Sequence, residues 1–312
     1  MKSSRYTYVS RFALAFASCL LTPPAFAAPI SLSTLSLVGT SQLVSPTLLR
    51  LTPNFDTAPN SPDPPAGGAW TQNTLDVSKG FAASFAFRMS DATGQVDPAD
   101  GSGGDGIAFV IQNDFRGTGA IGRGAGGIGF LGIFDSVAVM FDTYQNNYAY
   151  GDPNGNYVSV NTRGTAFNVP HLFCTGGELT TDLSKALDLP GEHCNANPSL
   201  GLTVLNSSLL DNGAVHQVQL IYIPGSLAVY LDGLQILTVP LNLAQTLSLQ
   251  GGTNAYLGFT AGTRFSYQNQ DIVEFSFTPI PEPATVLLCL SGFALLAAVQ
   301  WKRGRGVQPR KY

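Results

Sequence analysis

The sequence predicts an all-β domain in which two large antiparallel sheets pack face to face. Charged residues make up 12% of the chain and it contains 34 glycines, a composition typical of many short strands that meet at turns. Strand-like runs recur through the middle of the chain, and no long amphipathic helical period or internal repeat separates them. Because each sheet has one apolar face to bury, packing one sheet on the other is the simplest arrangement.

The expected strands are runs in which apolar and polar residues alternate, or in which β-branched and aromatic residues are enriched. They cover residues 81–88, 106–112, 136–144, 157–161, 215–223, 227–231, 235–239, 256–260 and 272–277. Pro224-Gly225 and Asp232-Gly233 separate three of them and predict tight hairpin turns. Residues 28–278 are therefore expected to form one β-sandwich domain.

Residues 1–27 have the features of a secretory signal peptide. A basic start precedes the apolar segment 12–21, and the sequence A-F-A at 25–27 provides a small-x-small cleavage site. The apolar segment is too short for a permanent membrane anchor. A lipoprotein signal at Cys19 is the alternative interpretation. Both interpretations predict that the protein is exported.

Residues 279–312 form a second targeting segment. A Pro-Glu-Pro motif at 281–283 is followed by the apolar run 284–300, an expected transmembrane helix, and then by a cluster of Lys and Arg. This order resembles the PEP-CTERM sorting signal of Gram-negative bacteria. The resemblance implies an inner-membrane-anchored precursor that faces the periplasm, processing by an exosortase, and a final location at the cell surface or outside the cell. An ordinary single-pass anchor is the alternative.

The region between these two segments is acidic. Residues 28–278 contain 8 Lys and Arg against 19 Asp and Glu, a net charge of −11. Nucleic acids and anionic lipids bind clustered Lys and Arg, so this composition predicts that nucleic acid is not a partner. The acidic region is instead suited to binding a divalent cation. Cys174 and Cys194 are the two cysteines of this region, and in an oxidising compartment they are expected to form a disulfide.

The stretch 137–161 contains the strongest candidate for a binding site. A strand that includes Asp142 leads into a polar loop with Asn146 and Asp152, and a second alternating run begins at Tyr157. Two carboxylates, an amide oxygen and the carbonyls of a kinked loop form the kind of ligand set that calcium prefers. A solvated hairpin loop is the simpler interpretation of the same residues.

This stretch resembles the metal-binding segment of the L-type (legume-like) lectins. The family pattern V-A-V-E-F-D-T-Y-x-N, followed by D-P, is matched here by V-A-V-M-F-D-T-Y-Q-N and D-P. The resemblance implies that the calcium ligands are Asp142, the Tyr144 carbonyl, Asn146 and Asp152.

Two positions depart from the family pattern. Legume members also bind a transition metal through a Glu and a His, and these positions hold Met140 and Tyr157 here. A thioether and a phenol are poor replacements in a manganese site, so the transition-metal site is expected to be lost. Animal members of the superfamily use calcium alone.

The resemblance extends over nearly the whole middle region and implies a concanavalin-like jelly-roll sandwich with a carbohydrate site. Asp105 in D-G-I-A-F matches the aspartate that contacts sugar in the family, and the Gly104–Asp105 peptide is expected to be cis. Gly127 in the Gly-Gly loop, Asn146, and Gly262 in G-F-T-A-G-T match positions that supply further amide and backbone contacts to the sugar.

These features predict a secreted, calcium-dependent carbohydrate-binding protein of the bacterial envelope or of extracellular polysaccharide, and not an enzyme. One alternative is a structural envelope or biofilm protein that has a lectin fold but binds no sugar. Another is a glycoside hydrolase. Hydrolysis normally needs two carboxyl groups that flank the scissile bond. The strand expected to carry such groups contains Asp142, and the first of the four Glu in the chain, Glu178, lies well after that strand.

Overall fold

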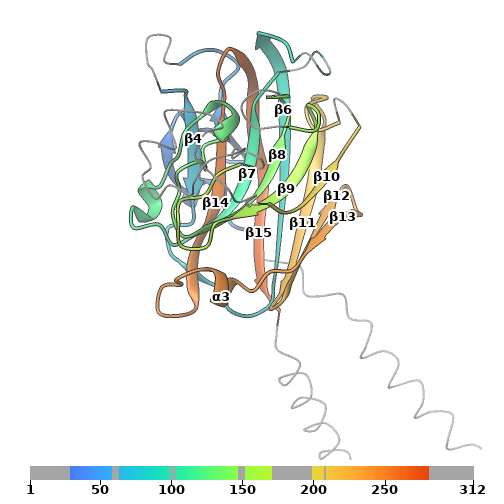
Figure 1. The fold of residues 1–312 in the computed structure, drawn as a ribbon. Coiled ribbons are helices and arrows are strands. Elements are labelled where there is room, and N and C mark those ends of the chain that lie inside the picture. The colour runs from blue at the N-terminus through green and yellow to red at the C-terminus, as the bar shows by residue number, and fades with distance from the viewer. Residues whose placement is uncertain are drawn as a thin grey trace, which may run out of the picture.

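The computed structural model describes residues 29–57, 63–97, 99, 101, 103–146, 152–170, 199–206 and 209–280. These residues form a sandwich of two antiparallel sheets, so the all-β prediction is confirmed (Figure 1). The expected signal peptide, the sorting tail with its transmembrane helix, and the Cys174–Cys194 disulfide lie outside the described residues. Within the described ranges, no helix is long and apolar enough to cross a membrane.

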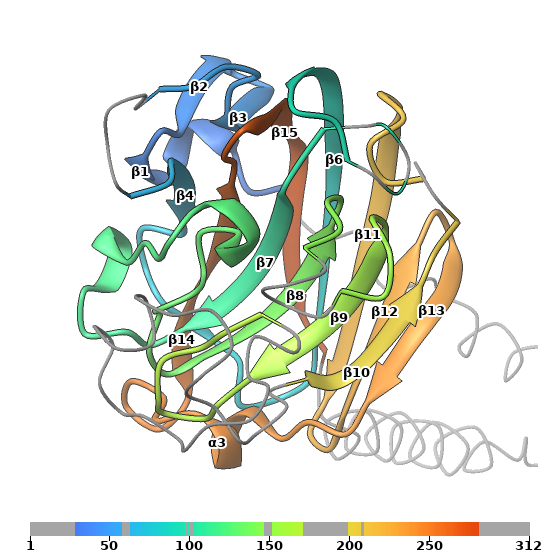
Figure 2. The ribbon, with the colours of Figure 1, turned by 45° about the horizontal axis from the view of Figure 1, so that its top comes forward.

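The front sheet has eight strands in the order β1-β4-β14-β7-β8-β9-β10, and β5 pairs with β14 outside this path. Their bounds are β1 Ser36–Gly39, β4 Ala66–Trp70, β5 Leu75–Asp76, β7 Gly106–Gln112, β8 Ser136–Asp142, β9 Tyr157–Thr162, β10 Ser199–Val204 and β14 Asn254–Gly262. Figure 2 looks onto this sheet, with strands of the other sheet behind it.

The back sheet has seven strands in the order β13-β12-β11-β6-β15-β3-β2. Their bounds are β2 Gln42–Ser45, β3 Leu48–Thr52, β6 Phe81–Gly94, β11 Val215–Ile223, β12 Ser226–Leu231, β13 Leu234–Val239 and β15 Ser266–Pro279. The long strands β6 and β15 pair from Phe81 and Pro279 at one end to Gly94 and Ser266 at the other. They therefore run the length of the sandwich (Figure 1).

The main core lies between the sheets, because strand alternation directs every second side chain inwards. The front strands contribute Phe109, Phe141 and Phe259, and the back strands contribute Phe85 and Phe275. Neighbouring ring centroids in this group are 5.0 to 6.1 Å apart. Truncating one such buried Phe to Ala costs about 3–5 kcal/mol, so the cluster holds the site-bearing strands firmly.

A second apolar cluster lies on the outer face of the front sheet, under the loop 113–135 (Figure 2). It consists of Trp70, Ala108, Val110, Ala120, Ile128, Phe130, Ile133, Ala138, Met140 and Tyr157. The loop contains the short 3-10 helices η2 (Gly117–Gly119) and η3 (Ala125–Gly127). The other helices among the described residues are η1 (Leu32–Thr34) and α3 (Leu243–Thr246). Both faces of the front sheet are therefore buried where this loop covers it.

The expected strands are confirmed in position, with differences at their ends. β6 and β15 are longer than predicted, because their backbone pairing continues through polar residues that the apolar alternation does not mark. The short strands β1, β2, β3, β4, β5 and β10 also lie outside the predicted runs. The Asp232-Gly233 hairpin is confirmed, with φ values of 49° and 81° that match the left-handed conformation of a type I′ turn.

Candidate functional site

Three loops meet at one end of the front sheet. Gly106, the first residue of β7, pairs with Asp142 of β8 on one side and with Gly262 of β14 on the other. Beyond this row, the Asp105 amide donates to the Gly262 carbonyl at 3.1 Å, and the Thr143 amide donates to the Asp105 carbonyl at 2.9 Å. The register of the sheet therefore places Asp105, Asp142 and Gly262 side by side.

Asp105 is a buried carboxylate with unused capacity to accept hydrogen bonds. Its peptide bond to Gly104 is cis, as expected from the sequence, and the residue is only 3% exposed. Burial raises the pKa of Asp105 to about 8, although hydrogen bonds from the Asn146 side chain and the Arg264 amide act in the opposite direction. Its Oδ2 atom is buried without a hydrogen-bond partner. A donor group that entered this site would find a ready acceptor.

The residues of the predicted calcium loop form one hydrogen-bonded unit. The Tyr144 amide donates to Asp142 Oδ1 at 3.0 Å, and the Asn146 amide donates to Asp152 Oδ2 at 2.8 Å. Asn146 Nδ2 donates to the Tyr144 carbonyl at 3.1 Å. The structure therefore brings Asp142, Tyr144, Asn146 and Asp152 together, and Asn146 lies between the loop and Asp105.

The two positions that depart from the family pattern are also close to these groups. The Tyr157 hydroxyl donates to Asp152 Oδ1 at 2.5 Å and lies 3.3 Å from Asp142 Oδ2. Met140 and the Tyr157 ring belong to the second apolar cluster. The phenol therefore occupies the space between the two loop carboxylates, while the thioether is packed among apolar side chains.

The loop has the chemistry of a hard-cation site. Burial, and then repulsion from Asp152, raise the pKa of Asp142 well above its ordinary value. Burial also raises the pKa of Asp152 to about 7. In the described part of the chain, no three His, Cys, Asp or Glu side chains form a metal-binding group, so a cation here would depend on two carboxylates with amide and carbonyl oxygens. Such an oxygen-only set fits calcium.

Asp97 is a site residue that the sequence pattern misses, because it lies in an Asp- and Gly-rich run typical of a solvated loop. It is buried, and its Oδ2 accepts from the Gln145 amide at 2.8 Å while its Oδ1 accepts from the Ala99 amide at 2.6 Å. A Cβ at Gly155 would lie 2.3 Å from Asp97 Oδ2, so this approach requires glycine. Asp97 thus joins its own loop to the predicted calcium loop.

Two glutamines of β15 support the site from the back sheet and are likewise not marked by any motif. Gln270 Nε2 donates to the Gly104 carbonyl at 3.2 Å and to the Gly262 carbonyl at 3.0 Å. Gln268 Nε2 donates to Thr143 Oγ1 at 2.8 Å. Both glutamines are fully buried. They connect all three loops of the site to a single strand.

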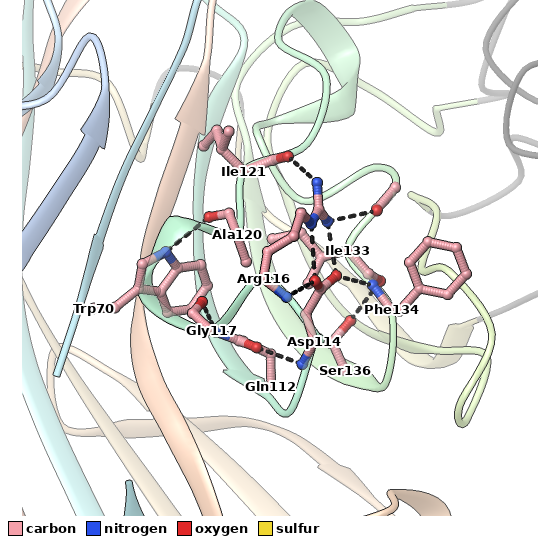
Figure 3. Close-up of polar contacts among 11 residues, drawn as sticks. Trp70, Gln112, Asp114, Arg116, Gly117, Ala120, Ile121, Ile133, Phe134 and Ser136 are labelled. Carbon is pink, nitrogen blue, oxygen red and sulfur yellow. Dashed lines mark hydrogen bonds and ion pairs between the residues drawn. The ribbon is translucent and has the colours of Figure 1, made fainter. Parts of the chain in front are cut away.

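The loop 113–135 is fixed by a compact polar network (Figure 3). Arg116 Nε and Nη2 donate to the two oxygens of Asp114 at 2.8 and 2.7 Å, and its remaining donors reach the Ile121 and Gly132 carbonyls. Burial favours the neutral form of Asp114, but hydrogen bonds from Arg116 and the Phe134 amide outweigh it and lower the pKa of Asp114. The network holds the segment that contains Gly127.

Gly127 itself is buried in this segment. Its amide donates to the Gly124 carbonyl at 3.0 Å within η3. The segment lies against the end of β14, since a Cβ at Gly262 would be 2.6 Å from the Ala125 carbonyl oxygen. The structure thus places Gly127 near the site but uses its amide inside the turn.

The chain matches the model of the legume lectin domain over residues 26–286. It therefore belongs to the legume lectin domain family. Among solved structures, peanut lectin, determined with a nine-residue peptide, is 21% identical, with 83% of this chain and 100% of that chain covered and a TM-score of 0.56. The exoplasmic/lumenal domain of VIP36 in a Ca2+/Man-bound form is 17% identical, with 80% and 84% covered and a TM-score of 0.52. At these identities the structural similarity establishes the fold.

A plant protein also aligns with part of the chain. The probable L-type lectin-domain containing receptor kinase S.7 of Arabidopsis thaliana is 30% identical over 110 residues, which is 32% of this chain. The alignment spans 15% of the length of that protein.

Proposed function

We propose that the protein is a calcium-dependent carbohydrate-binding protein, with a sugar site formed by Asp105, Asn146 and Gly262. The buried Asp105 carboxylate is the main support, because its Oδ2 atom has no hydrogen-bond partner and the Asn146 amide and the Gly262 backbone lie beside it. Sugar hydroxyls donate hydrogen bonds, and those to a carboxylate are of the stronger, charge-assisted kind. Membership of a lectin family supports binding over hydrolysis.

Calcium is proposed to be held by Asp142, Asp152, the Tyr144 carbonyl and the Asn146 side chain. The oxygen-only donor set and the VIP36 structure in a Ca2+/Man-bound form support this assignment. The cation would supply positive charge that keeps both carboxylates ionised. By fixing the loop, it would also hold Asn146 in the orientation that reaches Asp105.

The setting of this activity is proposed from the sequence. Residues 1–27 direct export, and residues 279–312 direct exosortase-dependent sorting to the envelope or to extracellular polysaccharide. Gly127 is proposed to lie next to the ligand as part of the η3 turn, which would border the sugar site. Its amide is not proposed as a donor to the sugar, because it already donates within the turn.

The substitution Asp105→Asn tests the sugar site. It keeps the side-chain volume and removes the carboxylate, which a cation bound nearby would keep ionised. In the presence of calcium we therefore expect at least a ten-fold loss of glycan affinity, the effect of about 1.5–3 kcal/mol for a charge-assisted hydrogen bond. Affinity for a glycan identified on an array is measured by calorimetry, with circular dichroism as the folding check. Gln219→Ala, at an exposed position of β11, is the control and should bind normally. Full affinity in Asp105→Asn would place the sugar elsewhere.

A broad glycan array separates this function from the structural alternative. If the folded wild-type protein binds no glycan at all, the lectin fold serves a structural role in the envelope or matrix, and the binding proposal fails.

A further inference from the structure

The side chain of Tyr157 connects the two carboxylates of the proposed calcium loop. It is the first residue of β9 and lies directly opposite Asp142, the last residue of β8. Its hydroxyl is 2.5 Å from Asp152 Oδ1 and 3.3 Å from Asp142 Oδ2. The shorter contact is the principal hydrogen bond, and the longer one keeps Asp142 within reach of the same proton.

The position of this hydroxyl is fixed by its surroundings. Tyr157 is 0% exposed, and its ring packs in the second apolar cluster together with Met140 and Trp70. Its backbone is held in the β8–β9 ladder. A rigid aromatic ring therefore presents the O–H group at one place between the carboxylates, with little rotational freedom to lose.

The other oxygen of each carboxylate is held by the loop itself. Asp142 Oδ1 accepts from the Tyr144 amide, and Asp152 Oδ2 accepts from the Asn146 amide. With the hydroxyl on the remaining oxygens, both carboxylate planes are constrained from two sides. A phenol O–H is a hydrogen-bond donor at neutral pH, so it suits a place between two acceptor oxygens.

We propose that Tyr157 is a positioning residue that organises a single-cation site, because its hydroxyl links Asp142 to Asp152 and sets the orientation of both carboxylates. This inference rests on the calcium site proposed above. The link is neutral, so it orders the two carboxylates without offsetting their negative charge. The full charge of both carboxylates then remains available to one calcium ion.

Tyr157→Phe is the direct test, because it removes the hydroxyl and keeps the buried ring. We expect calcium affinity, measured by calorimetry, to fall about 10- to 100-fold, the usual effect of losing a group that orients metal ligands. Tyr222→Phe is the matched control. Tyr222 is also fully buried, and its hydroxyl accepts from the Leu243 amide at 2.9 Å in another part of the fold. This variant should bind calcium like the wild type. Wild-type affinity in folded Tyr157→Phe would overturn the proposal.

Metal stoichiometry of the wild-type protein provides a second test that needs no variant. We expect one calcium per chain, and no Mn2+ bound in the presence of saturating calcium, as measured by electron paramagnetic resonance of free Mn2+. A second cation bound with Mn2+ selectivity would overturn the proposal. In the double variant Met140→Glu/Tyr157→His, a Mn2+ site should appear, because carboxylate and imidazole suit this metal.

These outcomes separate the two proposals. If the wild type binds no calcium, the proposed metal site is wrong. If the wild type and Tyr157→Phe bind calcium equally well, the calcium site stands and the role of Tyr157 is wrong.

Discussion

Four buried carboxylates lie at one end of the front sheet: those of Asp97, Asp105, Asp142 and Asp152. Repulsion between them contributes to the raised pKa values, since Asp152 and Asp97 act on Asp105, and Asp105 acts on Asp142. Isolated charges are expensive to bury, and burial is tolerated when a cation or hydrogen bonds compensate. At the residue scale, this arrangement supports the proposed cation site next to the proposed acceptor for sugar hydroxyls.

The calcium-free protein is expected to lose stability as the pH rises from above 3.8 to about 8, and to level off at higher pH. The pKa values of Asp152 and Asp105 are about 7 and about 8 in the folded protein, above the ordinary 3.8, so the folded state holds protons that the unfolded state has released. The stabilisation from these protons is complete below the ordinary pKa and is lost as the pH passes through the folded values.

Thermal unfolding midpoints in the presence of a chelator, from about pH 5 to about pH 9, measure this loss. Saturating calcium is the control, and it should reduce the decline because a bound cation holds the carboxylates in their ionised form. Equal declines with and without calcium would mean that Asp152 is not a metal ligand.

At the scale of single elements, β15 connects the back sheet to the site. Its Gln268 and Gln270 are buried amides in the polar half of the strand, and they donate to Thr143, Gly104 and Gly262. Buried polar groups are stabilising when they are hydrogen-bonded, and they specify one arrangement of the segments that they connect. The loops of the site are therefore positioned by a strand of the opposite sheet.

We expect Gln270→Leu to weaken glycan binding about ten-fold and to lower stability by about 1–3 kcal/mol, the contribution of its two hydrogen bonds. The volume of the side chain is nearly kept, so the effect reports the lost bonds to Gly104 and Gly262. Glycan affinity and denaturant unfolding are measured together. Gln219→Leu on the exposed face of β11 should change neither, and unchanged binding in Gln270→Leu would show that the loops hold their positions without it.

The sequence predicts the strands and loop residues whose patterns are short and continuous along the chain. β7 and β11 coincide with their predicted runs, and Asp142, Asn146 and Asp152 are close in the chain as well as in space. The supporting contacts are different in kind. Gln270 reaches Gly104 across 166 positions and Gln268 reaches Thr143 across 125, so no local pattern marks these residues. Both glutamines lie in the polar run S-Y-Q-N-Q-D, which carries no strand pattern and does not identify a partner.

At the scale of the whole molecule, the site and the two ends of the described chain lie at opposite ends of the sandwich. Near one end, the Arg264 amide binds Asp105 beside the Gly94–Ser266 pair. At the other end, Pro279 pairs with Phe81 and the Ile280 amide donates to the Gly80 carbonyl. The 14 residues of β6 separate these ends by about 45 Å. A surface attached through the C-terminal side would face away from the site.

Attachment through the C-terminal end is therefore expected to leave glycan affinity unchanged. The dissociation constant of protein captured by a C-terminal tag, measured by surface plasmon resonance, should equal the value from calorimetry in solution. A markedly weaker value for the captured protein would indicate that the ligand contacts the end of the sandwich that carries Pro279.

Calcium binding and glycan binding are proposed to depend on one another through the loop that contains Asp142, Asn146 and Asp152. A glycan-array measurement of one protein preparation, first with calcium and then after chelation, tests this dependence. We predict strong binding to a restricted set of glycans with calcium, loss of that binding with chelator, and recovery when calcium is restored. Undiminished binding after chelation would contradict the proposed role of the metal.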